Sequence, residues 1–219
     1  MSAEPTFLRW SGPALSGALA VIVAGAVVLP WTDPGPLSDQ MVQHLLLMNV
    51  FGPLVGLFVA RRAPLIERPR TLWAAGLVQI VLLWAWHAPS VQGTASGGAL
   101  THVGLLAVLA LASVIFWAAI LRSSETAPWR GIVALLLTGK LACLLGGLLI
   151  FAPRDLYGLP HLAFALCSSG PSSLADQQLA GLLMVTACPL SYLTAGVVVA
   201  ARMIDDLGRR LGSASAASS

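Results

Sequence analysis

The sequence has little charge, and this scarcity excludes several classes of protein. Only 10% of its 219 residues are charged and 57% are hydrophobic, whereas an ordinary soluble domain has about 25% charged residues. A soluble globular domain and a disordered chain are both at odds with this composition. The net charge of +3 is too small to indicate nucleic-acid binding.

Cysteines are few and widely spaced. The three, Cys143, Cys167 and Cys188, form no Cys-x-x-Cys pair and are odd in number, so neither a disulfide framework nor a zinc knuckle is predicted.

Six long apolar segments account for most of the chain. Each is close to the roughly 20 residues that cross a bilayer as a helix, and the breaks between them contain Pro, Gly or both. The uninterrupted runs do not alternate as barrel strands do. We therefore expect an all-α fold, a polytopic membrane bundle of about six transmembrane helices. The predicted spans are residues 7–29, 40–60, 72–87, 99–121, 131–151 and 178–201.

The basic residues predict how the bundle is oriented. Ten of the twelve lie on one side of it, and an excess of Lys and Arg marks the cytoplasmic side. The predicted organisation is a cytoplasmic N-terminus (1–6), a transmembrane domain (7–201) and a cytoplasmic tail (202–219), disordered in its Ser- and Ala-rich part, 212–219. A cleaved signal peptide remains an alternative for the first span. The ten residues are Arg9, Arg61, Arg62, Arg68, Arg70, Arg122, Arg130, Arg202, Arg209 and Arg210.

The four histidines all fall on the opposite, outer side of this topology. His44 lies about one turn inside the second span, His87 ends the third, His102 begins the fourth, and His161 lies in the long outer loop. On the second span, Met41, His44 and Met48 share one helical face. Thioether and imidazole suit Cu(I), but methionines at helical spacing also occur as packing residues, and both readings stay open.

Two further residues are unusual for their position. Lys140 lies near the middle of the fifth span, where an ammonium group costs at least about 2.5–3.5 kcal/mol. Its partner could be the polar Asn49 or Gln79, or an acid on another protein. A deprotonated, uncharged lysine and snorkelling to the interface are the alternatives. Asp176 precedes the sixth span, where it suits the positive end of the helix as an N-cap.

Four segments together resemble a known family. They are MVQHLLLM (41–48) with Gly52-Pro53, WAWHAP (84–89), LGGLLIFAPRDLY (145–157) and DQQLAG (176–181). In these segments the chain resembles the CtaG family of the caa3 type, polytopic bacterial proteins implicated in assembling the copper and haem centres of cytochrome c oxidase.

The resemblance implies an assembly factor of the bacterial plasma (inner) membrane, not an enzyme, that works with terminal oxidase subunits and holds copper transiently near the outer face. The expected copper ligands are His44, His87, His102, Met41 and Met48, with Asp176, Gln43 and Lys140 in supporting or structural roles. No nucleic-acid partner is expected, and contacts are to membrane lipid and other membrane subunits. The alternatives are a structural subunit of a larger membrane complex and a haem-binding electron carrier.

Overall fold

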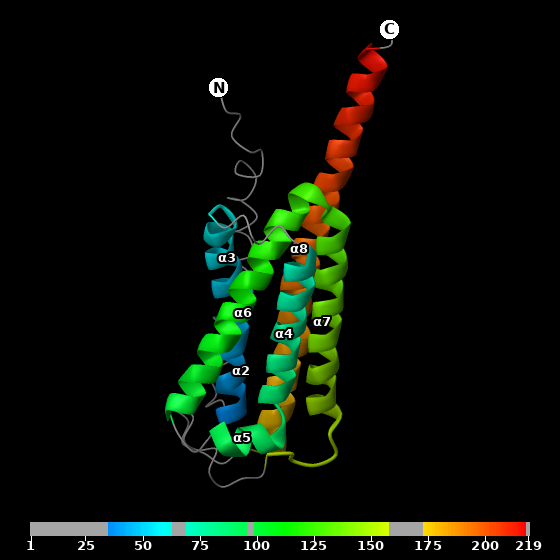
Figure 1. Ribbon diagram of the computed structural model, residues 1–219. Helices are drawn as coiled ribbons and strands as arrows, with labels where there is room; N and C mark the ends of the chain where they lie inside the picture. The colour runs from blue at the N-terminus through cyan, green and yellow to red at the C-terminus, as the bar shows by residue number, and fades with distance from the viewer. Residues whose placement is uncertain (1–34, 63–68, 96–98, 158–172, 218–219) are drawn as a thin grey trace. The chain divides into compact units, whose positions relative to one another are not determined.

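The computed structural model describes residues 35–62, 69–95, 99–157 and 173–217, and the regular secondary structure in these ranges is entirely helical. The all-α prediction is confirmed for this part of the chain. The elements are α2 (Pro36–Leu46), the π-helical segment η1 (Leu47–Phe51), α3 (Gly52–Ala60), α4 (Pro69–Trp86), α5 (Pro89–Ala95), α6 (Ala99–Thr126), α7 (Pro128–Phe151) and α8 (Leu174–Ala217) (Figure 1).

Four helices in the described ranges are long and apolar enough to cross a membrane. They are Pro36–Ala60, which joins α2, η1 and α3, then Leu100–Thr126, Pro128–Phe151 and Leu174–Ser213. Four of the predicted spans correspond to them. The predicted span 72–87 corresponds to α4, a helix of 18 residues that is not among the four, and the span 7–29 lies outside the described residues. The count of six membrane crossings therefore stays a prediction.

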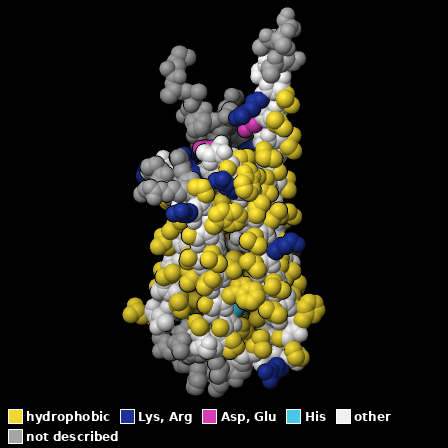
Figure 2. All heavy atoms as spheres, turned by 45° about the vertical axis from the view of Figure 1, so that its right-hand side comes forward, with side chains coloured by type: hydrophobic (Ala, Val, Ile, Leu, Met, Phe, Trp, Pro, Cys, Tyr) yellow, Lys and Arg dark blue, Asp and Glu magenta, His cyan; other side chains and the backbone are white. Residues whose placement is uncertain are grey.

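Many large apolar side chains lie on the surface of the helices. Large side chains such as Leu77 on α4, Leu111 on α6 and Leu193 on α8 are more than half exposed, and hydrophobic side chains are spread over the middle of the face seen in Figure 2. Apolar surface on this scale is stable only against lipid or a protein partner. The buried core is nevertheless well formed, with Phe116, Trp117 and Tyr192 in mutual ring contact.

Small residues bring α7 and α8 close together. A Cβ atom added to Gly181 would lie 2.7 Å from the carbonyl oxygen of Gly146, and one added to Gly146 would lie 2.9 Å from that of Gly181. Such a contact allows two helix backbones to pack directly against each other, as is usual in membranes, where packing rather than water drives helix association.

The π-helical segment η1 exposes a backbone carbonyl to a neighbouring helix. In a π-type helix the carbonyl of Met48 would accept a bond from residue 53, but Pro53 has no N–H to donate. The indole Nε1 of Trp117 on α6 donates to this oxygen instead, at 2.7 Å, and the Ser113 hydroxyl does so at 3.3 Å. The second predicted span is thereby attached to α6.

The two ends of the bundle differ in charge. At one end, called here the α5 end, α2, α6 and α8 begin and α4 and α7 finish, beside α5 (Figure 1). The opposite end is called the arginine end. Its described arginines lie just after α3, at the start of α4, near the junction of α6 and α7, and on the last part of α8. They are Arg61, Arg62, Arg70, Arg122, Arg130, Arg202, Arg209 and Arg210, while Arg154 is the described arginine that follows α7 at the α5 end.

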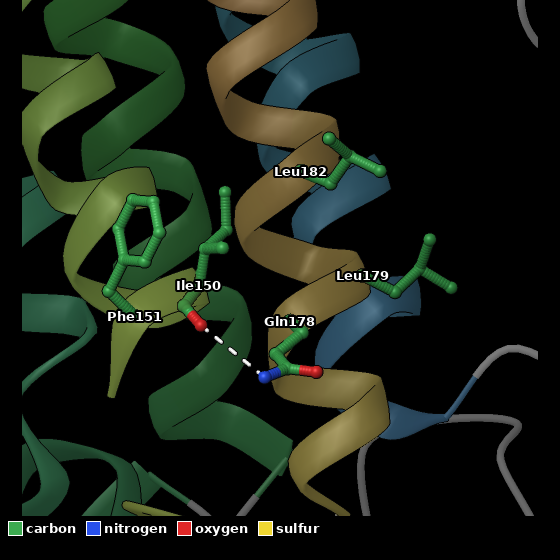
Figure 3. A pocket seen from close by; sticks show the side chains of 5 residues that line it. All are labelled: Ile150, Phe151, Gln178, Leu179 and Leu182. Atoms are coloured by element: carbon green, nitrogen blue, oxygen red, sulfur yellow. Dashed lines mark hydrogen bonds between the residues drawn. The ribbon is translucent and has the colours of Figure 1, made fainter. Parts of the chain in front are cut away.

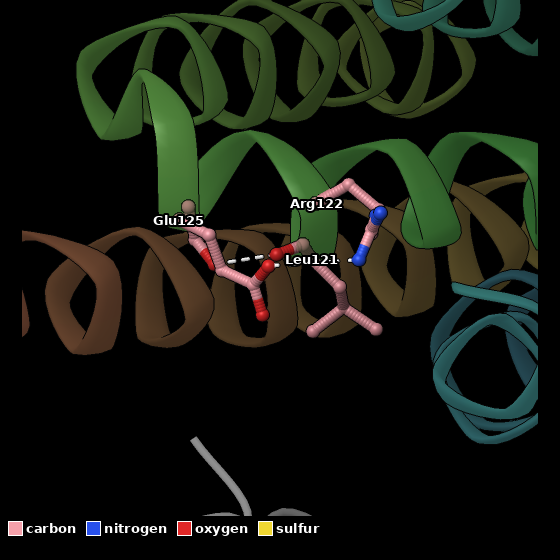
Figure 4. Close-up of polar contacts among 4 residues, drawn as sticks. Leu121, Arg122 and Glu125 are labelled. Atoms are coloured by element: carbon pink, nitrogen blue, oxygen red, sulfur yellow. Dashed lines mark hydrogen bonds and ion pairs between the residues drawn. The ribbon is translucent and has the colours of Figure 1, made fainter. Parts of the chain in front are cut away.

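One ion pair illustrates the polar character of the arginine end. Arg122 and Glu125 share the last turns of α6, with 3.6 Å between the guanidinium nitrogen and the carboxylate oxygen (Figure 4). Partly exposed pairs of this kind add little stability, but they show that α6 ends in polar surroundings.

Residues 212–217, part of the predicted disordered tail, are helical in the structure, because α8 continues to Ala217. The extension begins with an ion pair one turn apart, between Asp206 and Arg209. Leu, Ala and Arg, which are good helix formers, make up much of it. The Ser and Ala composition, which indicated disorder, is therefore compatible with the end of a long helix.

Candidate metal-binding site

His44 lies inside the bundle at the α5 end rather than at an exposed helix boundary. Its side chain, on the third turn of α2, is 0% exposed, and neither ring nitrogen has a hydrogen-bond partner in the residues that the structure describes. Buried polar atoms normally have partners, since an unpaired one costs about 1–3 kcal/mol. The imidazole of His44 therefore keeps an unused capacity to bind something.

His87 stands next to His44, immediately after α4. The two ring centroids are 5.5 Å apart in an edge-to-face arrangement. His87 Nδ1 is 2.7 Å from the carbonyl oxygen of Leu83, and because a carbonyl can only accept, Nδ1 carries the proton. The lone pair of a neutral His87 is then on Nε2. Metal-binding histidines are commonly held in this way by a bond from the other ring nitrogen to a backbone carbonyl.

Tyr157 fixes the backbone at His87. Its hydroxyl donates to the carbonyl oxygen of His87 at 2.7 Å. Burial, with a smaller contribution from the nearby Asp155 carboxylate, raises the pKa of Tyr157 to about 12. The phenol therefore keeps its proton near neutral pH and remains a donor.

His102 completes the group from the first turn of α6. Its ring packs against the ring of Trp86, with centroids 5.1 Å apart. Trp86 also contacts the ring of His44, with centroids 4.9 Å apart. His102 is mostly buried and its Nε2 has no partner in the described ranges. The structure thus brings together three of the four predicted histidines, with Trp86 between two of them. His161 lies outside the described residues.

The predicted thioether ligands lie in the core. Met41 and Met48 are each 1% exposed and belong to the main apolar cluster of the bundle, so both are packing residues whatever else they do. Gln43, next to His44 on α2, is half-buried. A different glutamine of α2, Gln40, links α2 to α5: its Oε1 accepts a hydrogen bond from Gln92 Nε2 at 2.8 Å.

The arrangement is not a closed metal cage. Among the described residues, no three His, Cys, Asp or Glu side chains are placed to hold a metal ion together. The ring contacts define a pair, His44 and His87. The ring of Trp86 separates His102 from His44. The donor types nevertheless fit copper, because neutral imidazole binds it well and three imidazole nitrogens, two on His44 and one on His102, are buried without a partner. The assignment of these residues as ligands stays a prediction.

Asp176 binds the start of a different helix from its own. Its carboxylate accepts from the backbone N–H of Leu37 at 2.9 Å and of Ser38 at 3.0 Å, and from the Ser38 hydroxyl at 2.6 Å. The prediction that Asp176 caps α8 is wrong, because the hydroxyl of Ser173 accepts from the Asp176 N–H at 3.1 Å in that role. Asp176 instead caps α2, the helix that carries His44.

The next residue, Gln177, ties two further segments to the α5 end. Its Oε1 accepts from the N–H of Leu156 at 2.8 Å, and its Nε2 donates to the carbonyl of Leu149 at 3.0 Å. Sequence reasoning did not assign it a role, although it stands in the DQQLAG motif. Trp86 and Tyr157 were missed as well, and both occur in motifs that carried the family resemblance.

Lys140 lies apart from this site. Its side chain is exposed on the outer surface of α7. The two polar residues considered as partners are engaged elsewhere, since Gln79 donates to the Tyr192 hydroxyl at 2.6 Å and Asn49 accepts from the Ser191 hydroxyl at 2.7 Å. Neither Asn49 nor Gln79 therefore compensates Lys140.

These features define a polytopic helical membrane protein with a buried histidine group at one end. Within that class, the model of the cytochrome c oxidase caa3 assembly factor family (Caa3_CtaG) matches residues 14–206. The match covers most of the chain, and the protein belongs to this family. No curated protein and no solved structure matches the chain significantly.

Proposed function

We propose that the protein supplies copper to cytochrome c oxidase during its assembly, taking up Cu(I) as cargo at the α5 end of the bundle. The family membership supports the role in oxidase assembly. The observation that carries the copper proposal is the group of unpartnered imidazole nitrogens on His44 and His102, beside the oriented ring of His87. We propose no catalytic role for the protein.

The geometry supports transient binding. His87 would offer Nε2, because its other nitrogen is engaged with Leu83, and His44 would offer either nitrogen. A pair of imidazoles, with His102 or a methionine joining them, leaves Cu(I) under-coordinated. An ion held by so few ligands can be passed on to a partner more readily than one in a four-ligand cage.

We further propose that the α5 end faces outward across the bacterial plasma membrane. The support is the gathering of described arginines at the opposite end, since basic residues near helix ends mark the cytoplasmic side. In this orientation, and with the predicted first span crossing the membrane, both chain termini are cytoplasmic. The histidines are near the outer surface, within reach of oxidase subunits and of copper donors.

Cysteine labelling tests this orientation. In a chain whose Cys143, Cys167 and Cys188 are replaced by serine, Ser90→Cys on α5 should react with a membrane-impermeant maleimide in intact cells, because Ser90 is exposed at the α5 end. Ser213→Cys on α8 should react only after the cells are permeabilised. The reverse pattern would place the histidines on the cytoplasmic side and contradict delivery at the outer face.

Titration with Cu(I) tests the copper proposal directly. The full chain, purified in detergent, should bind about one Cu(I), and His87→Ala should weaken binding about tenfold or more. His161→Ala is the matched control, because this histidine lies outside the proposed ligand set. Binding that is equal in wild type and His87→Ala would contradict the proposed site.

The same preparation separates the alternatives. A purified protein with a Soret band that His44→Ala abolishes would favour a haem-binding carrier. A protein that binds no metal but purifies with its complex at fixed stoichiometry would favour a structural subunit.

A further inference from the structure

We propose that the outer face of α7 around Lys140 docks a transmembrane helix of another protein, and that this helix carries a carboxylate near the middle of the membrane. The proposal is independent of copper binding, which concerns the α5 end of the bundle. It rests on the depth of Lys140, the openness of its face, and the absence of a suitable acid among the described residues.

The depth of Lys140 makes an uncompensated charge unfavourable. It stands 12 residues after the start of α7 and 11 before its end, or about 18 Å and 16 Å from the two ends at 1.5 Å per residue. An ammonium group at this depth is expensive to keep in hydrocarbon, and such residues usually pair with another group. A side chain of about 6 Å cannot reach either interface from there without strain.

The face around Lys140 is open and apolar. Residues three, four, seven and eleven positions away lie on the same side of a helix. Among them, Leu136, Leu137, Leu144 and Phe151 are exposed, Phe151 at 84%. A Cβ added to Gly147, on the same face, would have no atom within 4 Å. A partner helix could therefore approach the α7 backbone closely at this point.

The surface beside this face is hollowed where α7 ends. Ile150 and Phe151 on α7, with Gln178, Leu179 and Leu182 on α8, line a hollow of about 450 Å³ (Figure 3). The Gln178 amide spans the gap, donating to the Ile150 carbonyl at 3.4 Å. A helix seated there and running along α7 would reach Lys140 ten residues later, about 15 Å deeper. The acid of the partner is therefore expected about ten residues from its outer end.

A second copy of this chain does not offer such an acid from its described residues. Asp39 and Asp176 lie in the first turns of α2 and α8, and Glu125 lies in the last turn of α6. Asp155 follows α7, while Asp205 and Asp206 lie in the part of α8 beyond the predicted span. Charge complementarity at mid-depth thus favours a different protein.

Designed peptides test the proposal with the full-length protein in phosphatidylcholine vesicles. Three leucine-rich transmembrane peptides carry Glu, Gln or Leu at the central position, and energy transfer measures their association. We expect the Glu peptide to bind the wild type at least tenfold more tightly than the other two. Lys140→Met, which keeps the length of the side chain, should remove this difference.

Two further variants separate docking on this face from simple attraction of charge. Leu111 is exposed at the middle of α6, so Lys140→Met with Leu111→Lys moves the cation to another helix at similar depth. We expect it not to restore tight binding. Gly147→Phe keeps Lys140 but fills the open face, and should weaken binding.

Three results would overturn the proposal: equal binding of the Glu and Leu peptides, restoration of binding by lysine on α6, or loss of self-association in Lys140→Met without any peptide. Loss of self-association in Lys140→Met would show that a second copy of this chain, and not another protein, docks on the face around Lys140. Copper binding by purified Lys140→Met should equal that of the wild type, so failure of this proposal is distinguishable from failure of the copper site.

Discussion

Replacing His44 by leucine should give a protein that is more stable than the wild type and fails to supply copper to the oxidase. The two imidazole nitrogens of His44 are buried without partners in the described ranges. An apolar side chain of similar size removes that penalty, so we expect a gain of about 1–3 kcal/mol in the free energy of unfolding. A stabilising substitution that abolishes function is the signature of a residue kept for binding rather than for folding.

The measurement has two parts. Thermal unfolding of the purified variants in detergent reports stability, and copper per haem in the oxidase, at equal levels of the assembly factor, reports delivery. His44→Ala should lose delivery as well but gain less stability, since it leaves a cavity. His44→Met should retain more delivery than either, because a thioether can bind Cu(I).

Thr138→Val is the matched control, because Thr138 is a buried polar residue of α7 outside the histidine group. It should leave oxidase copper unchanged. If His44→Leu is fully active in delivery, copper does not pass through this histidine, and the structural-subunit alternative gains weight.

The grouping of the histidines was predictable from sequence because it depends only on topology. Alternating helix directions place the start of α2, the end of α4 and the start of α6 at one end of the bundle, so His44, His87 and His102 had to be near one another in depth. Their lateral contacts were not predictable. They depend on which helices are neighbours and on Trp86, whose ring contacts both His44 and His102; a tryptophan near a helix end is ordinarily read as an interfacial residue.

The predictions that failed concern interactions distant in sequence. Asp176 has the features of an N-cap for α8. Only the fold shows that its carboxylate accepts a hydrogen bond from the N–H of Ser38, 138 positions away. Asn49 and Gln79 are at the right depth for Lys140 but face α8, where Ser191 and Tyr192 engage them. Depth follows from sequence spacing, whereas the direction a residue faces requires knowledge of which helices are neighbours.

Asp176→Ala should be the most destabilising single substitution at the α5 end. It would leave the N–H groups of Leu37 and Ser38 and the Ser38 hydroxyl without their acceptor. Hydrogen bonds to a charged group contribute about 1.5–3 kcal/mol each, and the negative charge also complements the positive end of α2. We expect a loss of at least about 3 kcal/mol in the free energy of unfolding, and weaker Cu(I) binding because α2 carries His44.

Gly35 provides an independent check, because it leaves room for this carboxylate. A Cβ added there would lie 2.3 Å from the carboxyl carbon of Asp176, so Gly35→Ala should displace the side chain and destabilise the protein in the same way. The two effects should not add: once Asp176→Ala has vacated the space, Gly35→Ala should cost little more, as expected for residues in direct contact. Gly104→Ala, whose Cβ would have no atom within 4 Å, is the control and should not destabilise the protein, since Ala is the better helix former. Additive losses from Gly35→Ala and Asp176→Ala in thermal unfolding would show that the carboxylate is not what holds the start of α2 in place.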